Sequence, residues 1–129
     1  MAHILLVDDE VAVAARNAAA LEAAGHMVSV VPTAAAAFEA VRRLDPDLVV
    51  LEAMLDGSFA GFDLARTLAT SHPELPLIML TRADEHLSPA VLAAQDRDGG
   101  WLPVERYLAK PVLPDVLVYE VEHLLEAAA

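Results

Sequence analysis

Acidic, hydroxyl and amine side chains stand at the ends of short apolar runs in this sequence. They follow four of its five runs, as Asp8-Asp9-Glu10, Glu52, Thr81 and Lys110-Pro111. Carboxylates gathered in one place repel one another, and a hard divalent cation such as Mg²⁺ relieves that repulsion. A lysine and a threonine beside such a metal are suited to hold phosphoryl oxygens. These residue types therefore indicate phosphate chemistry, provided that the fold brings them together.

Short apolar runs are the elements that would position these residues. They cover residues 4–7, 27–31, 48–51, 77–80 and, more weakly, 106–109. Because they lack polar alternation, they are typical of strands buried on both faces. Helical patterns occupy residues 11–24, 34–44, 61–70, 88–95 and the stretch from 114 onward. Five strands alternating with five helices predict a parallel α/β sheet with helices on both faces.

The first two helices carry the clearest local signals. Gly25 provides a stop for the first, and Thr33 is suited to cap the second. The stripe of the first helix that we expect to face the core is formed by Val11, Ala14, Ala18 and Leu21.

The bulk properties exclude several classes of function. The 129 residues suit one domain, and their net charge of -12 argues against direct binding to nucleic acid or to an anionic membrane. No apolar stretch approaches the roughly 20 residues of a membrane span. The chain has no cysteine, so thiolate metal sites and disulfides are excluded. A cytoplasmic protein is the simplest expectation.

The carboxyl ends of parallel strands are where functional residues gather in open α/β sheets, so we expect the polar groups to share one edge. Each of them also has an ordinary interpretation. These are helix caps for Asp8 and Asp9, a solvated loop residue for Glu52, a capping hydroxyl for Thr81 and a surface charge for Lys110. Their occurrence at successive strand ends is what favours a shared site.

Four segments make the chain similar to the receiver domain of two-component response regulators. They are LLVDDE at 5–10, PDLVVL at 46–51, LPLIMLT at 75–81 and YLAKP at 107–111. The likeness spans nearly the whole chain. It implies a flavodoxin-like (βα)5 fold, a doubly wound five-stranded parallel sheet in the order 2-1-3-4-5, and a single receiver-like domain over residues 1–129.

The resemblance also implies a role for each polar residue. In the family, an acidic pair binds Mg²⁺ and an aspartate at a strand end takes a phosphoryl group from a histidine kinase. The metal-ligand candidates are Asp8, Asp9 and the acceptor-position residue, Glu52. The phosphoryl pocket and its switch would be formed by Thr81, Tyr107, Lys110 and the cis-prone Pro111.

Glutamate at the acceptor position departs from the family pattern. The added methylene of Glu52 moves the carboxylate about 1.5 Å farther out. An error near 1 Å can cost on the order of 100-fold in rate, so efficient phosphorylation is not expected. Glu52 would instead hold the site negative, within ion-pair range of Lys110 or Arg82. We expect Mg²⁺ to bind weakly or not at all, and no cofactor to be required.

The leading hypothesis is therefore a pseudo-receiver, meaning a receiver-like module that signals by protein–protein contact without phosphoryl transfer and is not an enzyme. Its partner would be a histidine kinase or a downstream effector, and the sequence does not reveal which, nor the oligomeric state. One alternative is a conventional phosphorylatable receiver that uses Glu52 or Asp56. Another, less favoured because the first apolar run ends in Asp-Asp-Glu and not in an Asp-x-Asp nucleophile motif, is a small metal-dependent phosphohydrolase.

One further departure concerns the stretch before the fifth strand. Residues 96–105 resemble an insertion on the family's main partner-binding face, so we expect an altered output surface. Trp101 in this stretch is either an exposed anchor for a partner or, somewhat more in keeping with large apolar residues, packed onto the core.

Overall fold

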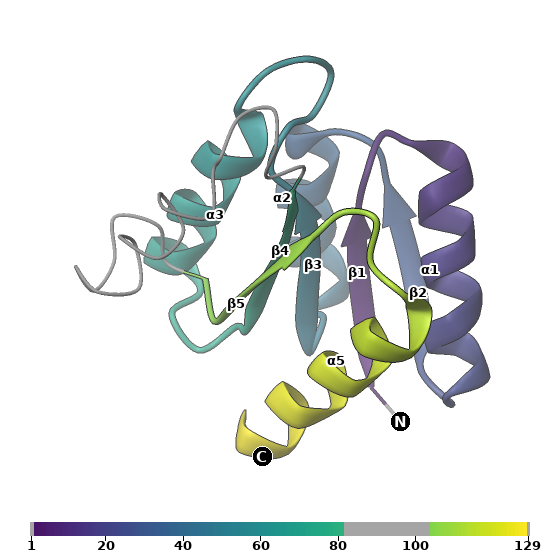
Figure 1. Ribbon diagram of the computed structural model, residues 1–129. Helices are drawn as coiled ribbons and strands as arrows, with labels where there is room; N and C mark the ends of the chain where they lie inside the picture. The colour runs from purple at the N-terminus through teal and green to yellow at the C-terminus, as the bar shows by residue number, and fades with distance from the viewer. Residues whose placement is uncertain (1, 82–103, 129) are drawn as a thin grey trace.

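A five-stranded parallel sheet forms the centre of the computed structural model, which describes residues 2–81 and 104–128 (Figure 1). The strands are β1 (His3–Val7), β2 (Met27–Val31), β3 (Leu48–Glu52), β4 (Leu77–Thr81) and β5 (Arg106–Ala109). Their order is β2-β1-β3-β4-β5, and every neighbouring pair is parallel. The predicted fold class and strand order are confirmed.

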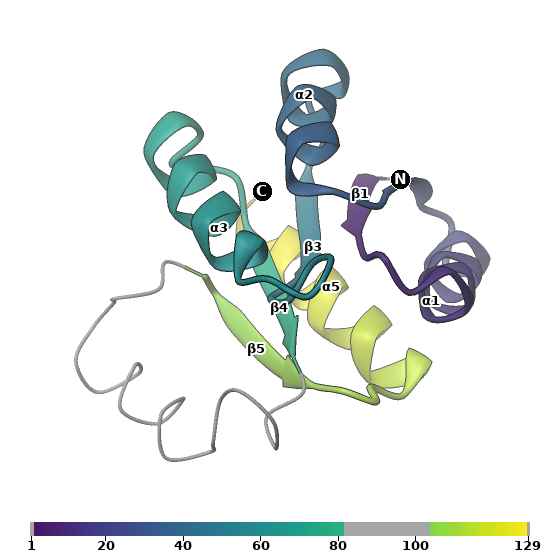
Figure 2. The same ribbon diagram turned by 90° about the horizontal axis from the view of Figure 1, so that it is seen from above.

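Four helices are described, two on each face of the sheet (Figure 2). Helices α1 (Val11–Ala23) and α5 (Pro114–Ala128) pack on one face, and α2 (Ala34–Leu44) and α3 (Ala60–Ser71) on the other. None of these four is long and apolar enough to cross a membrane. The predicted helix over 88–95, Arg82, Trp101 and most of the 96–105 stretch lie outside the described residues.

The three central strands build both halves of the core by alternation. Leu5, Val49 and Met79 face α2 and α3, whereas the intervening Leu6 and Val50 face α1 and α5. Every residue of β3 and β4 is buried, as the unbroken apolar runs predicted. Full burial of one such side chain contributes about 1.5–3 kcal/mol. This rigid centre fixes the positions of the residues that follow each strand.

The outer strands do not follow that prediction. In β2, Met27 is 55% exposed and Val30 46%, because β2 lies at the edge of the sheet with only β1 beside it. The expectation that this run is buried on both faces is wrong. β5, at the opposite edge, is also only partly buried.

The predicted helix signals are confirmed at two positions. The hydroxyl of Thr33 accepts a hydrogen bond of 3.1 Å from the amide of Ala36, which caps α2. Gly25 follows α1 with a φ of 97°, a conformation that favours glycine.

The predicted apolar stripe of α1 is wrong at its first residue. Val11 is 82% exposed at the helix start, and the buried positions of α1 are Ala14, Asn17 and Leu21. The rest of the predicted stripe is confirmed, because Ala14 and Leu21 are buried and Ala18 packs against the same cluster. Asn17 adds a polar residue to this face. Among the described residues, neither side-chain atom of the amide of Asn17 has a hydrogen-bond partner.

Candidate functional site

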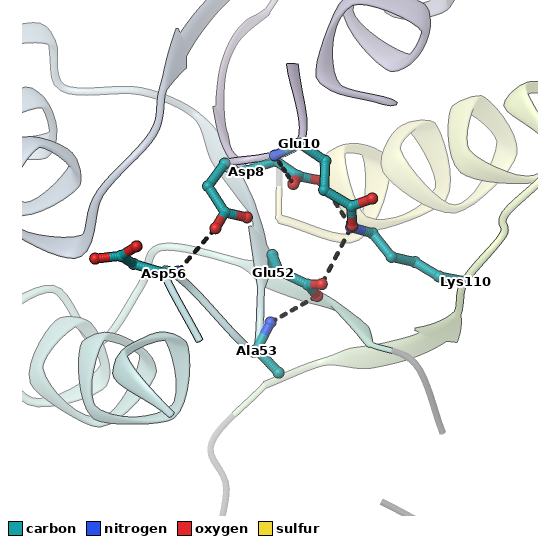
Figure 3. Close-up of polar contacts among 7 residues, drawn as sticks. Asp8, Glu10, Glu52, Ala53, Asp56 and Lys110 are labelled. Atoms are coloured by element: carbon teal, nitrogen blue, oxygen red, sulfur yellow. Dashed lines mark hydrogen bonds and ion pairs between the residues drawn. The ribbon is translucent and has the colours of Figure 1, made fainter. Parts of the chain in front are cut away.

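One lysine gathers the acidic residues at the carboxyl edge of the sheet (Figure 3). Lys110 directly follows β5, Glu52 is the last residue of β3, and Asp8 directly follows β1. The ammonium Nζ lies 3.1 Å from Oε1 of Glu52 and 3.0 Å from Oδ2 of Asp8. It also donates a hydrogen bond of 2.8 Å to Oε1 of Glu10. Lys110 is the only lysine in the sequence, and we call these four residues the acid–lysine cluster.

Burial separates the cluster from solvent on most sides. The side chains of Lys110 and Glu52 are only 4% and 5% exposed, and that of Asp8 is buried as well. Burial alone would lower the pKa of Lys110. The hydrogen bonds to Glu10 and Asp8 and the surrounding negative charge outweigh that effect, so the pKa lies above its usual value. The ammonium is therefore charged at neutral pH.

The carboxylate of Glu52 is held at both oxygens. Oε1 accepts a hydrogen bond from Lys110 at 3.1 Å, and Oε2 accepts one from the amide of Ala53 at 2.9 Å. Burial raises the pKa of Glu52, and the charge and hydrogen bond of Lys110 oppose the rise without cancelling it. The prediction that Glu52 lies within ion-pair range of Lys110 is confirmed.

The two acidic residues that follow β1, Asp8 and Asp9, contact different parts of the protein. Asp8 accepts a hydrogen bond of 2.9 Å from the amide of Glu10 at Oδ1, and its other oxygen pairs with Lys110. Asp9 instead accepts a hydrogen bond of 2.8 Å from the amide of Asp56. The N-cap of α1 is Glu10 and receives no side-chain cap bond, so the interpretation of Asp8 and Asp9 as helix caps is wrong.

The loop that Asp9 holds is a tight turn between β3 and α3. Leu55 and Ser58 exchange two backbone hydrogen bonds, and Asp56 and Gly57 between them have positive φ angles of 53° and 72°. Two consecutive positive φ angles are typical of a type I′ turn, for which Asp-Gly is a preferred sequence. Asp56 is exposed, and its carboxylate points away from Lys110 (Figure 3).

The predicted switch residues lie on the last two strands. Thr81 ends β4 and is buried, and its hydroxyl has no hydrogen-bond partner among residues 2–81 and 104–128. Its carbonyl accepts a hydrogen bond of 2.9 Å from the amide of Lys110. Tyr107 is partly buried in β5 and packs against the core on the α2 and α3 side. The bond between Lys110 and Pro111 is cis, as the resemblance implies.

The predicted metal ligands are not arranged as a metal centre. Both oxygens of Asp8 and both oxygens of Glu52 already contact hydrogen-bond donors of the protein. One oxygen of Asp9 accepts a hydrogen bond from the amide of Asp56 in the loop after β3. Mg²⁺ requires near-ideal octahedral oxygen geometry, and here an ammonium stands between the carboxylates. In the described parts of the chain, no group of three acidic, histidine or cysteine residues could hold a metal ion. The donor set as arranged does not fit the ion.

Glu10 is the member of the acid–lysine cluster to which the sequence assigned no individual role. Its position in the acidic run was apparent, but its contact with Lys110 depends on where α1 begins. A side chain that precedes a helix can turn toward the sheet edge or toward solvent, and the sequence alone does not distinguish these. The structure shows that Glu10 turns inward with 35% of its side chain exposed.

The whole-chain comparison decides the family. The model of the response regulator receiver domain matches residues 4–122. The chain belongs to this receiver-domain family. The receiver domain of NtrX from Brucella abortus has the same fold, with a TM-score of 0.80 and 31% identity, and the match covers 95% of this chain and 98% of that one.

Two curated relatives are longer proteins. The DNA-binding response regulator MtrA of Mycobacterium tuberculosis is 32% identical over 119 residues, which are 92% of this chain and 48% of MtrA. The transcriptional regulatory protein CreB of Escherichia coli K12 is 29% identical over 122 residues, which are 95% of this chain and 50% of CreB. The receiver-like chain thus spans about half the length of these relatives.

Proposed function

We propose that this receiver domain signals by protein–protein contact, with Glu52 as a permanent negative charge where its family carries a phosphorylatable aspartate. The chain would act in a phosphorelay-type pathway as a pseudo-receiver. Its partners would be a histidine kinase or a downstream effector protein.

The observation that carries this proposal is the engagement of both Glu52 oxygens. A carboxylate nucleophile needs an oxygen that can approach phosphorus in line with the leaving group. One oxygen of Glu52 is hydrogen-bonded to Lys110 and the other to the amide of Ala53, and the side chain is 5% exposed. Attack would require breaking one of these bonds in a buried setting. These contacts support the proposal that Glu52 supplies a negative charge to the site and does not accept a phosphoryl group.

The remaining features of the proposal follow from charge. A net charge of -12 disfavours contact between these 129 residues and nucleic acid, although MtrA is a DNA-binding regulator. The ammonium of Lys110 already supplies a cation to the acidic edge, so Mg²⁺ would be bound weakly and would not be required. A single domain over residues 1–129, a cytoplasmic location and the lack of an enzymatic activity remain parts of this proposal.

Phosphorylation of the intact chain tests it. The protein is incubated with acetyl phosphate and Mg²⁺, and its intact mass is measured. We expect the mass of the wild-type chain to stay unchanged, and Glu52→Asp, which shortens the side chain to that of the family acceptor, to gain one phosphoryl group. Stoichiometric, hydroxylamine-sensitive addition of phosphate to the wild type would defeat the proposal.

A conventional phosphorylatable receiver is the second candidate, and the exposed carboxylate of Asp56 favours it. Asp56 lies beside the acidic edge because its amide is bound to Asp9. In this case, Mg²⁺-dependent labelling would occur in the wild type and disappear in Asp56→Asn. Labelling that disappears only in Glu52→Gln would instead identify Glu52 as the acceptor.

A further inference from the structure

We infer that His26 is a proton-dependent switch between two partners at the amino edge of the sheet, where the strands begin. Its neutral ring binds the backbone of Ala2, the residue before β1, and its protonated ring releases Ala2 and pairs with Glu122 of α5. The switch lies at the edge opposite the acid–lysine cluster, so it is independent of the proposed function.

The position of His26 places its ring between three elements. Its amide donates a hydrogen bond of 3.1 Å to the carbonyl of Leu21, near the end of α1. Its side chain is 9% exposed and lines a hollow together with Ala2 and the last turns of α5. β1 begins and α5 ends at this edge of the sheet (Figure 1). The ring therefore lies where the residue before β1 and the end of α5 meet.

The contacts of the ring determine which nitrogen carries the proton when the ring is neutral. The amide of Ala2 lies 3.3 Å from Nδ1 and, as a backbone amide, can only donate. Nδ1 must therefore accept, which leaves the single proton of the neutral ring on Nε2. Nε2 lies 3.4 Å from Oε2 of Glu122 and has no hydrogen-bond partner among the described residues.

A second proton changes the balance between these two contacts. It binds Nδ1, which then becomes a donor that faces the N–H of Ala2, so this hydrogen bond is lost. The same proton places a positive charge 3.4 Å from the carboxylate of Glu122. The other charged residues that line the hollow, Asp47 before β3 and Glu126 of α5, are also acidic. The charges around the hollow therefore favour the protonated ring, whereas burial and the hydrogen bond from Ala2 favour the neutral ring.

The release is confined to the residue before β1. The carbonyl of Ala2 still accepts a hydrogen bond of 2.8 Å from the amide of Met27. The amide of His3 still donates one of 2.8 Å to Oδ2 of Asp47. Because neither bond involves the ring of His26, protonation changes the first contact of the strand and leaves the sheet paired.

Nuclear magnetic resonance of the intact, isotopically labelled chain tests the inference between about pH 8 and about pH 5, the range in which histidine ordinarily titrates. At the upper end, the ring nitrogens of His26 should show the tautomer with the proton on Nε2. On acidification, the amide proton resonance of Ala2 should shift upfield because its hydrogen bond is lost. This shift should have the same midpoint as the titration of the His26 ring nitrogens.

Two variants identify the group that causes the shift. His26→Gln keeps a side-chain oxygen that can accept a hydrogen bond from Ala2 but does not titrate, so most of the pH-dependent shift of Ala2 should disappear. The matched control is His123→Gln, which removes an exposed histidine of α5 that stacks on Tyr119. In this control, the shift of Ala2 should match that of the wild type.

A neutral His26 ring with its proton on Nδ1 would overturn the inference, and this readout requires no variant. A ring that stays neutral down to about pH 5, or one that titrates while the Ala2 resonance stays constant, would also overturn it. So would an Ala2 shift of wild-type size in His26→Gln, because another group would then cause the shift.

Discussion

At the scale of single residues, the acid–lysine cluster has three acids and one base, and this ratio helps to explain why the pKa values of both Lys110 and Glu52 are raised. One ammonium is shared by three carboxylates, so Lys110 is surrounded by opposite charge while Glu52 receives only part of one positive charge. The pKa of Lys110 is raised because its charged form gains three partners. Burial raises the pKa of Glu52 because the shared lysine does not fully offset its desolvation.

The raised pKa of Glu52 predicts a pH dependence. The folded state holds this proton more tightly than the unfolded chain, so stability attributable to Glu52 falls as pH rises from its ordinary value of 4.5 through its raised folded value. Glu52→Gln removes this titration. We expect the melting temperature of the wild type, relative to that of Glu52→Gln, to decrease between acidic and neutral pH.

Thermal melts of both proteins across this pH range give the difference between their melting temperatures. Because the other titrating groups are the same in both proteins, most of their contributions cancel in this difference. The control is Glu74→Gln, at an exposed residue of the loop between α3 and β4. Its difference from the wild type gives the baseline for the loss of one exposed carboxylate. A Glu52→Gln difference that grows in the opposite direction would show that Lys110 stabilises the ionised carboxylate more than burial penalises it.

Much of this site could be predicted because strand ends follow directly from the apolar runs. Glu52 ends β3 and Lys110 follows β5, with only β4 between them, so their pairing followed from the family topology and the reach of both side chains. The contact of Glu10 did not follow, since it depends on a single backbone turn before α1. The division between Asp8 and Asp9 also depends on the turn at Asp56, which is a tertiary contact across 47 residues.

At the scale of elements, α1 carries a polar residue in its buried face. Asn17 is fully buried, and both polar atoms of its side chain lack a partner among the described residues. An unsatisfied buried amide costs about 1–3 kcal/mol in protein mutational data. We expect Asn17→Leu to raise the free energy of unfolding by about 1 kcal/mol, part of the gain being offset by the larger side chain.

Urea denaturation of the wild type, Asn17→Leu and Asn17→Ala measures this effect. The alanine variant removes the amide but leaves a cavity, so its gain should be smaller. Destabilisation by both substitutions would indicate that the amide of Asn17 is satisfied by a bound water.

The start of α3 lies against the backbone at the end of β3. A carbon atom added at Gly61 would collide with the carbonyl oxygen of Glu52 and lie 2.6 Å from that of Ala53. Neither oxygen can move without displacing the strand end. Gly61→Ala is therefore expected to lower the free energy of unfolding by about 1–3 kcal/mol and to disturb the pairing of Glu52 with Lys110.

Chemical denaturation of Gly61→Ala checks this expectation. Gly57→Ala is a suitable comparison because nothing lies within 4 Å of its added carbon, and only its left-handed backbone opposes the change. That variant should lose about 1 kcal/mol. A Gly61→Ala protein as stable as the wild type would show that α3 can shift away from β3 at little cost.

The elements differ in how well the sequence predicts them. The all-apolar runs of β3 and β4 predicted strands buried on both faces, and these two strands lie inside the sheet and are fully buried. The run at β2 is apolar apart from Ser29 but lies at the edge of the sheet, and its exposure follows from the order of the strands. In α1, the apolar stripe predicted the buried face except at Val11, which is exposed at the helix start, and at Asn17, a polar residue that hydrophobic periodicity does not assign to a core.

At the scale of the whole molecule, the excess of acid sets a long-range repulsion. The chain carries 20 acidic and 8 basic side chains, for a net charge of -12. Such a charge destabilises the compact state through self-repulsion, and salt screens it. We expect the melting temperature to rise by several degrees when sodium chloride is increased from about 0.01 M to about 0.15 M.

Differential scanning fluorimetry at the two salt concentrations measures this rise, and sucrose at matched osmolarity is the control for general solvent effects. A melting temperature that stays constant or falls would show that local ion pairs, such as those of Lys110, outweigh the repulsion between distant acids.

The buried position of the sole lysine also decides how the protein responds to amine chemistry. Apart from the α-amino group, the chain has one primary amine that an acylating reagent, an acetyltransferase or an amine-specific crosslinker could modify, namely Nζ of Lys110. This nitrogen is surrounded by acidic side chains, and the lysine side chain is only 4% exposed. Selective isotopic enrichment of the Nζ atom of lysine would likewise yield a single side-chain nitrogen resonance. The chemical shift of this one atom would thus report on whether the ion pairs of Lys110 with the acidic residues are intact, broken or lost through modification of the amine.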